Sequence, residues 1–299
     1  MGASDLMDWV YLLQLTVNGL VLGLIYALIA AGLAMMFGVL EIVNFAHGEF
    51  LLVGAYAMAF ALPAFGLAYI PGVIVATIAC TAVGLVAYEI FLSRLERGEF
   101  ERSILITMGL SIVILYGIQY VFSATPMMVE TQFGYAGADV GDIRIAWTRL
   151  AAAGLAVLAF IFLYAVLNHT QLGRAMRAVA QNREAALMVG LKPARVARNA
   201  VALATALCGL AGAAIAPVQL VQPHMGQFLV FKALAIIIIG GMGSIGGAIV
   251  AAIGLGILEN WIGGFFPSIW QEAAGFIVMI VVLIVKPNGL FARGGVRVG

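Results

Sequence analysis

Charged residues are scarce in this chain. Only 10% of its 299 residues are Asp, Glu, Lys or Arg, and 64% are hydrophobic, whereas soluble domains carry about 25% charged residues. The basic residues lie in short segments between apolar runs, which argues against a nucleic-acid-binding surface. Several of these runs reach the roughly 20 residues that a membrane-spanning helix needs. The sequence therefore predicts an all-α polytopic membrane protein.

Residues that carry out chemistry are also few. Both cysteines, Cys80 and Cys208, fall in apolar runs, so we expect inert buried thiols rather than a disulfide or metal ligands. The three histidines, His47, His169 and His224, are far apart and lack metal-ligand spacing. We therefore expect no catalytic residues, no metal and no cofactor bound by this chain. The first ten residues contain no Lys or Arg, so we expect no cleavable signal peptide.

Apolar runs predict about eight membrane-crossing helices, some broken or re-entrant, within one transmembrane domain of residues 1–299. The first run is longer than one crossing needs, so we expect its helix to be tilted or broken. The runs 228–241 and 248–261 are each about 21 Å long as helices, so we expect them to meet inside the bilayer as a hairpin. The other predicted spans are 10–37, 50–65, 70–92, 104–122, 150–167, 199–220 and 269–285.

Basic residues predict the orientation. They concentrate at residues 94–102, 174–198 and beyond 285, and cytoplasmic loops of membrane proteins are rich in Lys and Arg. We therefore place these three segments, and the carboxyl terminus, in the cytoplasm. The acidic amino terminus and the loop 123–147 then face outward.

Residues 41–49, EIVNFAHGE, interrupt an apolar region with three ionisable side chains and an asparagine. Charged groups inside a membrane are costly and usually line a cavity or pair with one another. One interpretation is a discontinuous helix that borders a translocation path. The other is a turn at the cytoplasmic face whose charges reach water or a partner; the sequence leaves both open. A proton relay is a further hypothesis, although a single histidine between two carboxylates can simply be hydrogen-bonded. The path residues would be Asn44, Phe45, His47, Gly48 and Glu49.

A glycine-rich run, GGMGSIGG, occupies residues 240–247. No Lys follows it, so it is not a phosphate-binding loop; the conformational freedom of glycine suits a turn or hinge between helices. Two interrupted segments in corresponding places of a chain are typical of a transport pathway. The hinge residues would be Gly240, Gly241, Gly243, Ser244, Gly246 and Gly247.

Four ionisable residues stand alone in or beside apolar runs. They are Glu89, Lys232, Glu259 and Glu272. We expect Lys232 to lie near the outer end of its helix and to extend its ammonium group to the membrane surface. The two later glutamates flank aromatic residues, a pattern typical of a membrane interface.

Six of the fifteen basic residues lie in residues 171–198, between two long apolar runs. The centre of this segment, EAALMVG at 184–190, predicts a helix that ends at a glycine. Residue pattern alone leaves open whether this cytoplasmic helix meets lipid headgroups or a soluble protein.

Several segments together resemble the permease subunits of Liv-type ABC importers for branched-chain amino acids. Residues 18–56, NGLVLGLIYALIAAGLAMMFGVLEIVNFAHGEFLLVGAY, resemble the opening helix and break of that family. Residues 173–190, GRAMRAVAQNREAALMVG, resemble its coupling segment, and GGMGSIGG and KPNGLFA are also typical. The resemblance covers nearly the whole chain.

The resemblance implies a transport subunit rather than an enzyme. Such a permease sits in the bacterial inner membrane, amino terminus in the periplasm, and moves branched-chain amino acids inward by alternating access. The implied partners are a second, related but different permease, two cytoplasmic ATPases that bind ATP and Mg, and a periplasmic substrate-binding protein.

The resemblance also assigns roles within the coupling segment, about 171–198. Glu184, Ala185, Ala186 and Gly190 match the EAA---G pattern by which importer permeases dock in a groove of the ATPase, and Arg177 belongs to the same segment. The Ile-x-Leu-Pro that follows in other importers is replaced by Leu-Lys-Pro at 191–193.

Two alternatives stay open. The same machine could carry urea, short amides or small aromatic acids. An ion-coupled secondary transporter would need a mid-bilayer ion site, which only residues 41–49 could supply, and would leave the basic coupling segment without a role.

Overall fold

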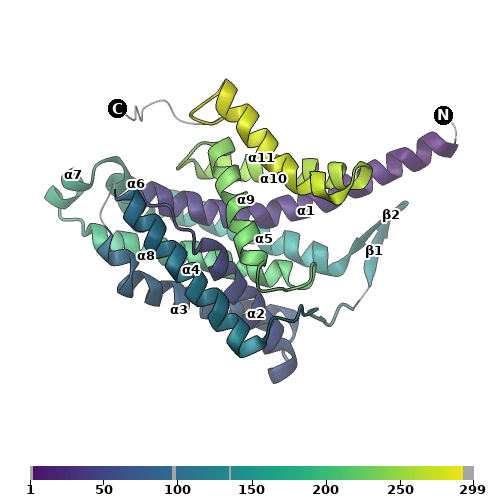
Figure 1. Cartoon of the computed structure of the whole chain (residues 1–299), viewed down its shortest axis with the longest axis horizontal. Coiled ribbons are helices and arrows are strands. Elements are labelled where there is room, and N and C mark those ends of the chain that lie inside the picture. Colours follow the sequence, from purple (N-terminus) through teal and green to yellow (C-terminus); the bar gives the residue numbers. More distant parts are fainter. Residues whose placement is uncertain (1–2, 96–98, 135, 292–299) are drawn as a thin grey trace.

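The computed structural model describes residues 3–95, 99–134 and 136–291. These residues form an all-α bundle with one small β-hairpin (Figure 1). Eight of the described helices are long and apolar enough to cross a membrane, which confirms the predicted polytopic fold. The helices are α1 (Ala3–Leu40), α2 (His47–Phe65), α3 (Tyr69–Ile90), the 3-10 helix η1 (Leu92–Arg94), α4 (Phe100–Phe122), α5 (Trp147–His169), α6 (Gln171–Gln181), α7 (Arg183–Met188), α8 (Pro193–Ile215), α9 (Met225–Gly240), α10 (Ile245–Phe265) and α11 (Ser268–Val285). The strands are β1 (Gly137–Val140) and β2 (Ile143–Ala146).

The bundle has two ends, which we name by what they carry. One end, on the left of Figure 1, carries the short helices α6 and α7, and we call it the α7 end. The opposite end carries the β1–β2 hairpin, and we call it the hairpin end. Gln14 of α1 fixes the position of the hairpin. Its Nε2 donates to the Arg144 carbonyl oxygen at 3.0 Å, and its Oε1 accepts from the Arg144 amide at 3.1 Å. The sequence predicted only a loop here. The basic tail from 292 onward lies outside the described residues.

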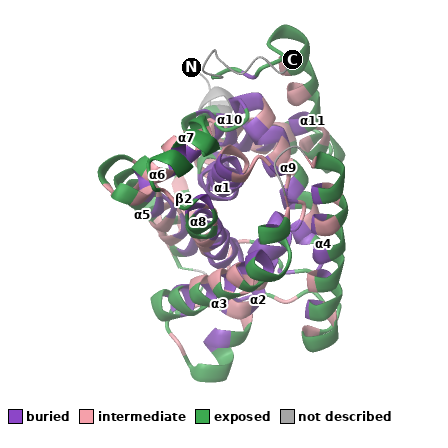
Figure 2. Cartoon of the chain, turned by 90° about the vertical axis from the view of Figure 1, so that its left-hand side faces the viewer, coloured by how far each residue is buried: buried purple, intermediate pink, exposed green. Residues whose placement is uncertain are grey.

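Helix α1 forms the centre of the bundle. Its most apolar window is 89% buried, whereas that of α11 is 11% buried, so α1 is an interior helix and α11 lies at the rim (Figure 2). Helix α1 packs against α8, α9 and α10. Where it crosses α10, a Cβ on Gly23 would lie 2.7 Å from the Ile253 Cα. Small residues permit such close approach of membrane helices.

The structure corrects two predictions about helix length. Helix α10 has 21 residues, about 31 Å, which is enough to cross a core of about 30 Å. The predicted hairpin of two short arms is therefore wrong for α10. Only α9, with 16 residues, is short among the described apolar helices. The run was underestimated because α10 incorporates glycines at both of its ends. The first helix is continuous from Ala3 to Leu40 and is not broken.

Candidate functional site

Residues 41–46 connect α1 to α2 and turn back into the interior of the bundle. The Phe45 amide donates to Thr107 Oγ1 of α4 at 3.2 Å, and His47 Nε2 lies 3.1 Å from the Ile29 carbonyl oxygen of α1. Ile29 precedes Leu40 by eleven residues, about 16 Å of helix, and the membrane core is about 30 Å thick. Helix α2 therefore begins beside the interior of α1, about half a membrane thickness along that helix from Leu40. The sequence left open whether residues 41–49 border a path or form a turn at the cytoplasmic face; the contacts place the segment inside the helix bundle.

Asn44 shapes the entry to α2. Its Oδ1 accepts a hydrogen bond from the Ala46 amide at 3.0 Å, the side-chain-to-backbone contact by which asparagine commonly starts a turn. The side chain is fully buried, and its Nδ2 lies 3.8 Å from Met36 Sδ. Asn44 therefore stabilises the break itself.

His47 faces α1 and α8. Besides the Ile29 carbonyl, its Nε2 lies 3.1 Å from Cys208 Sγ. Its Nδ1 has no hydrogen-bond partner among the described residues. Cys208 and Cys80 are both free and buried, as predicted.

Glu49 faces the opposite way, toward α4 and α9. It is fully buried in the first turn of α2, and its Oε1 accepts a hydrogen bond from Ser111 Oγ at 3.1 Å. Its Oε2 has no hydrogen-bond partner in the described part of the chain. This oxygen points at the first turn of α9, where a Cβ on Gly226 would lie 2.7 Å away. A buried carboxylate without a counter-charge is costly, although a position in the first turn of a helix offsets part of the cost.

The polar side chains that α4 contributes to this site were not predicted from the sequence. Ser103, Thr107 and Ser111 recur every four residues and are all buried. Thr107 bonds the break at Phe45, and Ser111 bonds Glu49. Their four-residue spacing within an apolar run was the signal that could have revealed a polar face on this helix.

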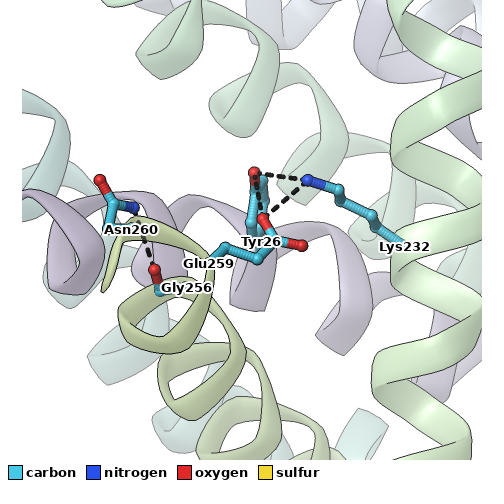
Figure 3. Close-up of polar contacts among 5 residues, drawn as sticks. All are labelled: Tyr26, Lys232, Gly256, Glu259 and Asn260. Atoms are coloured by element: carbon cyan, nitrogen blue, oxygen red, sulfur yellow. Dashed lines mark hydrogen bonds and ion pairs between the residues drawn. The ribbon is translucent and has the colours of Figure 1, made fainter. Parts of the chain in front are cut away.

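A second buried cluster joins α1, α9 and α10 (Figure 3). Lys232 Nζ lies 2.7 Å from Glu259 Oε2 and 3.1 Å from the Tyr26 hydroxyl oxygen, and that hydroxyl donates to the same Glu259 oxygen at 3.2 Å. Glu259 is 1% exposed. The expectation that Lys232 reaches the membrane surface is therefore wrong, because the opposite charge it needs is inside the bundle. Two lone residues of opposite charge in neighbouring apolar runs were the available signal.

The glycine-rich run forms the turn between α9 and α10, as predicted. Gly241 and Gly243 have φ values of 99° and 80°, which favour glycine. Ser244 Oγ accepts from the Gly247 amide at 3.2 Å and caps α10. Gly240 ends α9 and Gly246 lies in the first turn of α10.

The coupling segment forms two short helices at the α7 end. Asn182 caps α7, its Oδ1 accepting from the Ala185 amide at 2.9 Å. Gly190 has φ 81°, and the Leu191 amide donates to the Ala186 carbonyl at 3.0 Å, which is the Schellman pattern of a helix end. Gly190 and the Leu191 amide thus end the helix, and α8 begins at Pro193 of the Leu-Lys-Pro sequence.

Most side chains of α7 and of the residue that follows it are exposed in the described chain. Leu187, Met188 and Val189 are 55%, 90% and 75% exposed. Glu184 and Ala185 are also exposed, whereas Ala186 is buried.

Behind this surface, the coupling segment is attached to the bundle. The Arg177 guanidinium donates to the Leu167 carbonyl of α5. At the start of α8, the Ala194 carbonyl accepts from the Tyr88 hydroxyl at 2.9 Å, and Arg198 pairs with Glu89 at 3.0 Å. Displacement of α7 would therefore reach α3, α5 and α8.

No group of three or more His, Cys, Asp or Glu side chains within the described ranges could hold a metal ion.

Comparisons with known proteins agree on one kind of protein. A family model described as "Branched-chain amino acid transport system / permease component" matches residues 15–285. The chain is 28% identical to the high-affinity branched-chain amino acid transport system permease protein BraD of Pseudomonas aeruginosa, over 94% of this chain and 96% of BraD.

Two permease proteins of Escherichia coli K12 are also similar, both named as parts of a high-affinity branched-chain amino acid transport system. LivH is 25% identical over 96% of this chain and 97% of LivH. LivM is 28% identical over 92% of this chain and 69% of LivM. No solved structure matches the chain.

Proposed function

Because the chain belongs to the family of branched-chain amino acid transport permease components, we propose that it is the membrane-spanning permease subunit of an ATP-driven ABC importer of branched-chain amino acids. The observation that carries this proposal is the extent of the family match, residues 15–285, which includes both helix breaks and α7. The chain is a multi-pass membrane protein that serves transport rather than catalysis.

The proposed assembly has four kinds of component. Similarity to both LivH and LivM supports a pairing with a second, related permease. Two cytoplasmic ATPases would bind ATP and Mg, and a periplasmic protein would deliver the amino acid. The α7 end would then face the cytoplasm and the hairpin end the periplasm, in agreement with the basic residues at the α7 end.

Energy would enter through α7. Its exposed surface, residues 184–190, would dock in a groove of an ATPase, with the apolar side chains of Leu187, Met188 and Val189 buried on contact. Closure of the ATPases would displace α7 and, through the Tyr88–Ala194 and Glu89–Arg198 contacts, would move α3 with α8. Rigid-body motion of packed helices is a common form of such switching.

The path would lie beside the two helix breaks, at residues 41–49 and 240–247. Interrupted helices place polar groups at mid-membrane depth without exposing them to lipid. Phe45 and Glu49 approach α4 and α9 there, and Asn44 stabilises the turn beside them, whereas the glycine turn lies at the α7 end and would act as a hinge.

Docking is tested by reversing the charge at residue 184 and introducing a large side chain at residue 190. Glu184→Arg combined with Gly190→Arg should abolish uptake and release the ATPases during co-purification, while the protein still inserts in the membrane. Glu101→Arg, on an exposed residue at the same end of the bundle, is the matched control and should keep the ATPases bound. Unchanged co-purification of the double variant would contradict the proposal.

The substrate is tested with the reconstituted importer. Proteoliposomes that contain both permeases and the ATPases, supplied with the binding protein, should accumulate leucine only when ATP is present. Accumulation of urea or short amides instead of leucine would favour the alternative substrate, and accumulation without ATPases would favour a secondary transporter.

A further inference from the structure

Glu49 is a buried carboxylate at the break that has no counter-charge among the described residues, and one of its oxygens has no hydrogen-bond partner there. We infer that Glu49 receives the ammonium group of the substrate inside the helix bundle. This inference rests on the proposed function, because it takes the substrate to be an amino acid.

Glu49 lacks a charged partner among the described residues. Glu49 is fully buried, yet no basic side chain pairs with it in the described part of the chain, and its Oε2 accepts no hydrogen bond there. Charged residues inside membrane proteins are retained where they pair or where they contact what is transported. The other buried carboxylate, Glu259, also has one oxygen without a hydrogen-bond partner, but it is paired with Lys232, so what distinguishes Glu49 is the missing counter-charge.

The surroundings of Glu49 Oε2 suit a group that donates hydrogen bonds. Three elements meet here: α2 brings Glu49, α4 brings the Ser111 hydroxyl, and α9 brings Gly226 without a side chain. The oxygen atoms offered are acceptors, which suits the three N–H donors of an ammonium group. A metal ion is not favoured, since no cluster of three suitable ligands exists in the described ranges.

Two aromatic side chains lie next to Glu49 on the side of the α7 end. There the break, α4 and α9 contribute Phe45, Thr107 and Phe231, with the two aromatic rings 6.2 Å apart and the Phe45 amide bonded to Thr107. An aliphatic side chain would find apolar contact on these rings while its ammonium reached Glu49. Phe231 is 47% exposed, so the aromatic pair reaches the surface of the chain.

Helices α2 and α9 are closed over Glu49. Gly48 and Gly226 pack so closely that a Cβ on Gly226 would lie 2.9 Å from the Gly48 carbonyl oxygen. Helix α9 therefore covers Glu49, so α2 and α9 must separate before the carboxylate meets substrate. This structure thus shows the site closed, and alternating access would open it.

The test measures leucine imported per ATP hydrolysed, with the complete transporter in proteoliposomes and leucine-loaded binding protein. For Glu49→Gln this ratio should fall by about tenfold or more, the value of one charge-assisted hydrogen bond. Glu49→Asp, which keeps the charge, should recover part of the loss. Reduced assembly alone lowers import and ATP hydrolysis together and leaves the ratio unchanged.

Two controls separate the outcomes. Glu101→Gln, the same substitution on an exposed residue of α4, should keep the wild-type ratio. A Glu49→Gln ratio within about twofold of wild type, less than one such hydrogen bond is worth, would overturn the inference and leave the proposed function standing. Failure of the wild-type transporter to import leucine would overturn both.

Discussion

Glu259 and Glu49 are both buried carboxylates that meet α9, but they meet it in opposite ways. Glu259 finds Lys232 on that helix at 2.7 Å and the Tyr26 hydroxyl beside it. Six residues earlier on α9, Glu49 finds Gly226, which offers no side chain. One carboxylate is neutralised within the protein and the other is not.

The difference separates a structural role from a transport role. An ion pair inside a low-dielectric bundle holds its helices together only while both charges are present. The Lys232–Glu259 pair therefore fixes α9 to α10, and Tyr26 extends the contact to α1. A carboxylate without a counter-charge contributes nothing comparable to stability, and it remains available to a cationic group that arrives later.

Removal of the cation should have the largest effect. Lys232→Met leaves Glu259 buried without a counter-charge and should lower the free energy of unfolding by about 3–5 kcal/mol. Titration with SDS in mixed micelles measures this loss. Combining Lys232→Met with Glu259→Met removes both charges and should restore most of the stability. A loss of less than about 1 kcal/mol in the single variant, the range of an exposed ion pair, would erase the distinction between the two carboxylates.

A side chain introduced beside Glu49 should have the next largest effect. Gly226→Ala forces a Cβ against the Gly48 carbonyl and Glu49 Oε2, and overpacking of this kind costs about 1–3 kcal/mol. The variant should also impair uptake, since it prevents α2 and α9 from closing over Glu49, and alternating access needs the closed state. Gly254→Ala is the matched control, because a Cβ there meets no atom within 4 Å. Equal unfolding midpoints for the two variants would contradict the close approach of α2 and α9.

Loss of the third member of the Glu259 cluster should be milder. Tyr26→Phe removes one hydroxyl while the ion pair stays intact, and hydrogen bonds between membrane helices contribute about 1 kcal/mol or less. The same SDS titration measures the change. A loss as large as that of Lys232→Met would show that Tyr26, rather than the lysine, holds Glu259.

The sequence predicted much of this architecture, because apolar length and basic loops are direct consequences of the membrane. About eight membrane-crossing elements, an interruption at residues 41–49 and the glycine stop at Gly190 were all visible in it. Length alone did not distinguish a continuous α1 from a broken one. The full length of α10 was missed because glycines at its ends suggested interruptions, although neighbouring segments pack on several of them.

The pairing of side chains was harder to predict. Lys232 was expected at the membrane surface because a lysine in an apolar run usually reaches outward; only the packing of α9 on α10 brings it to Glu259. The depth of Glu49 depends on the chain turning back after Leu40, which no local pattern encodes. Tertiary contacts between distant segments, such as Ser111 with Glu49, decide these cases.

The smallest effect on stability should come from Glu49→Gln, and this sharpens the comparison most directly. The amide keeps the shape of the side chain and an oxygen that can accept from Ser111, so the free energy of unfolding should change by less than about 1 kcal/mol. Glu259→Gln, the same substitution on the paired carboxylate, leaves Lys232 without its counter-charge and should cost about 3 kcal/mol or more. If both substitutions destabilise the protein equally, Glu49 has a charged partner and is not free for substrate. If Glu49→Gln is neutral for stability but lowers import per ATP hydrolysed, the unpaired carboxylate serves transport and the paired one serves the fold.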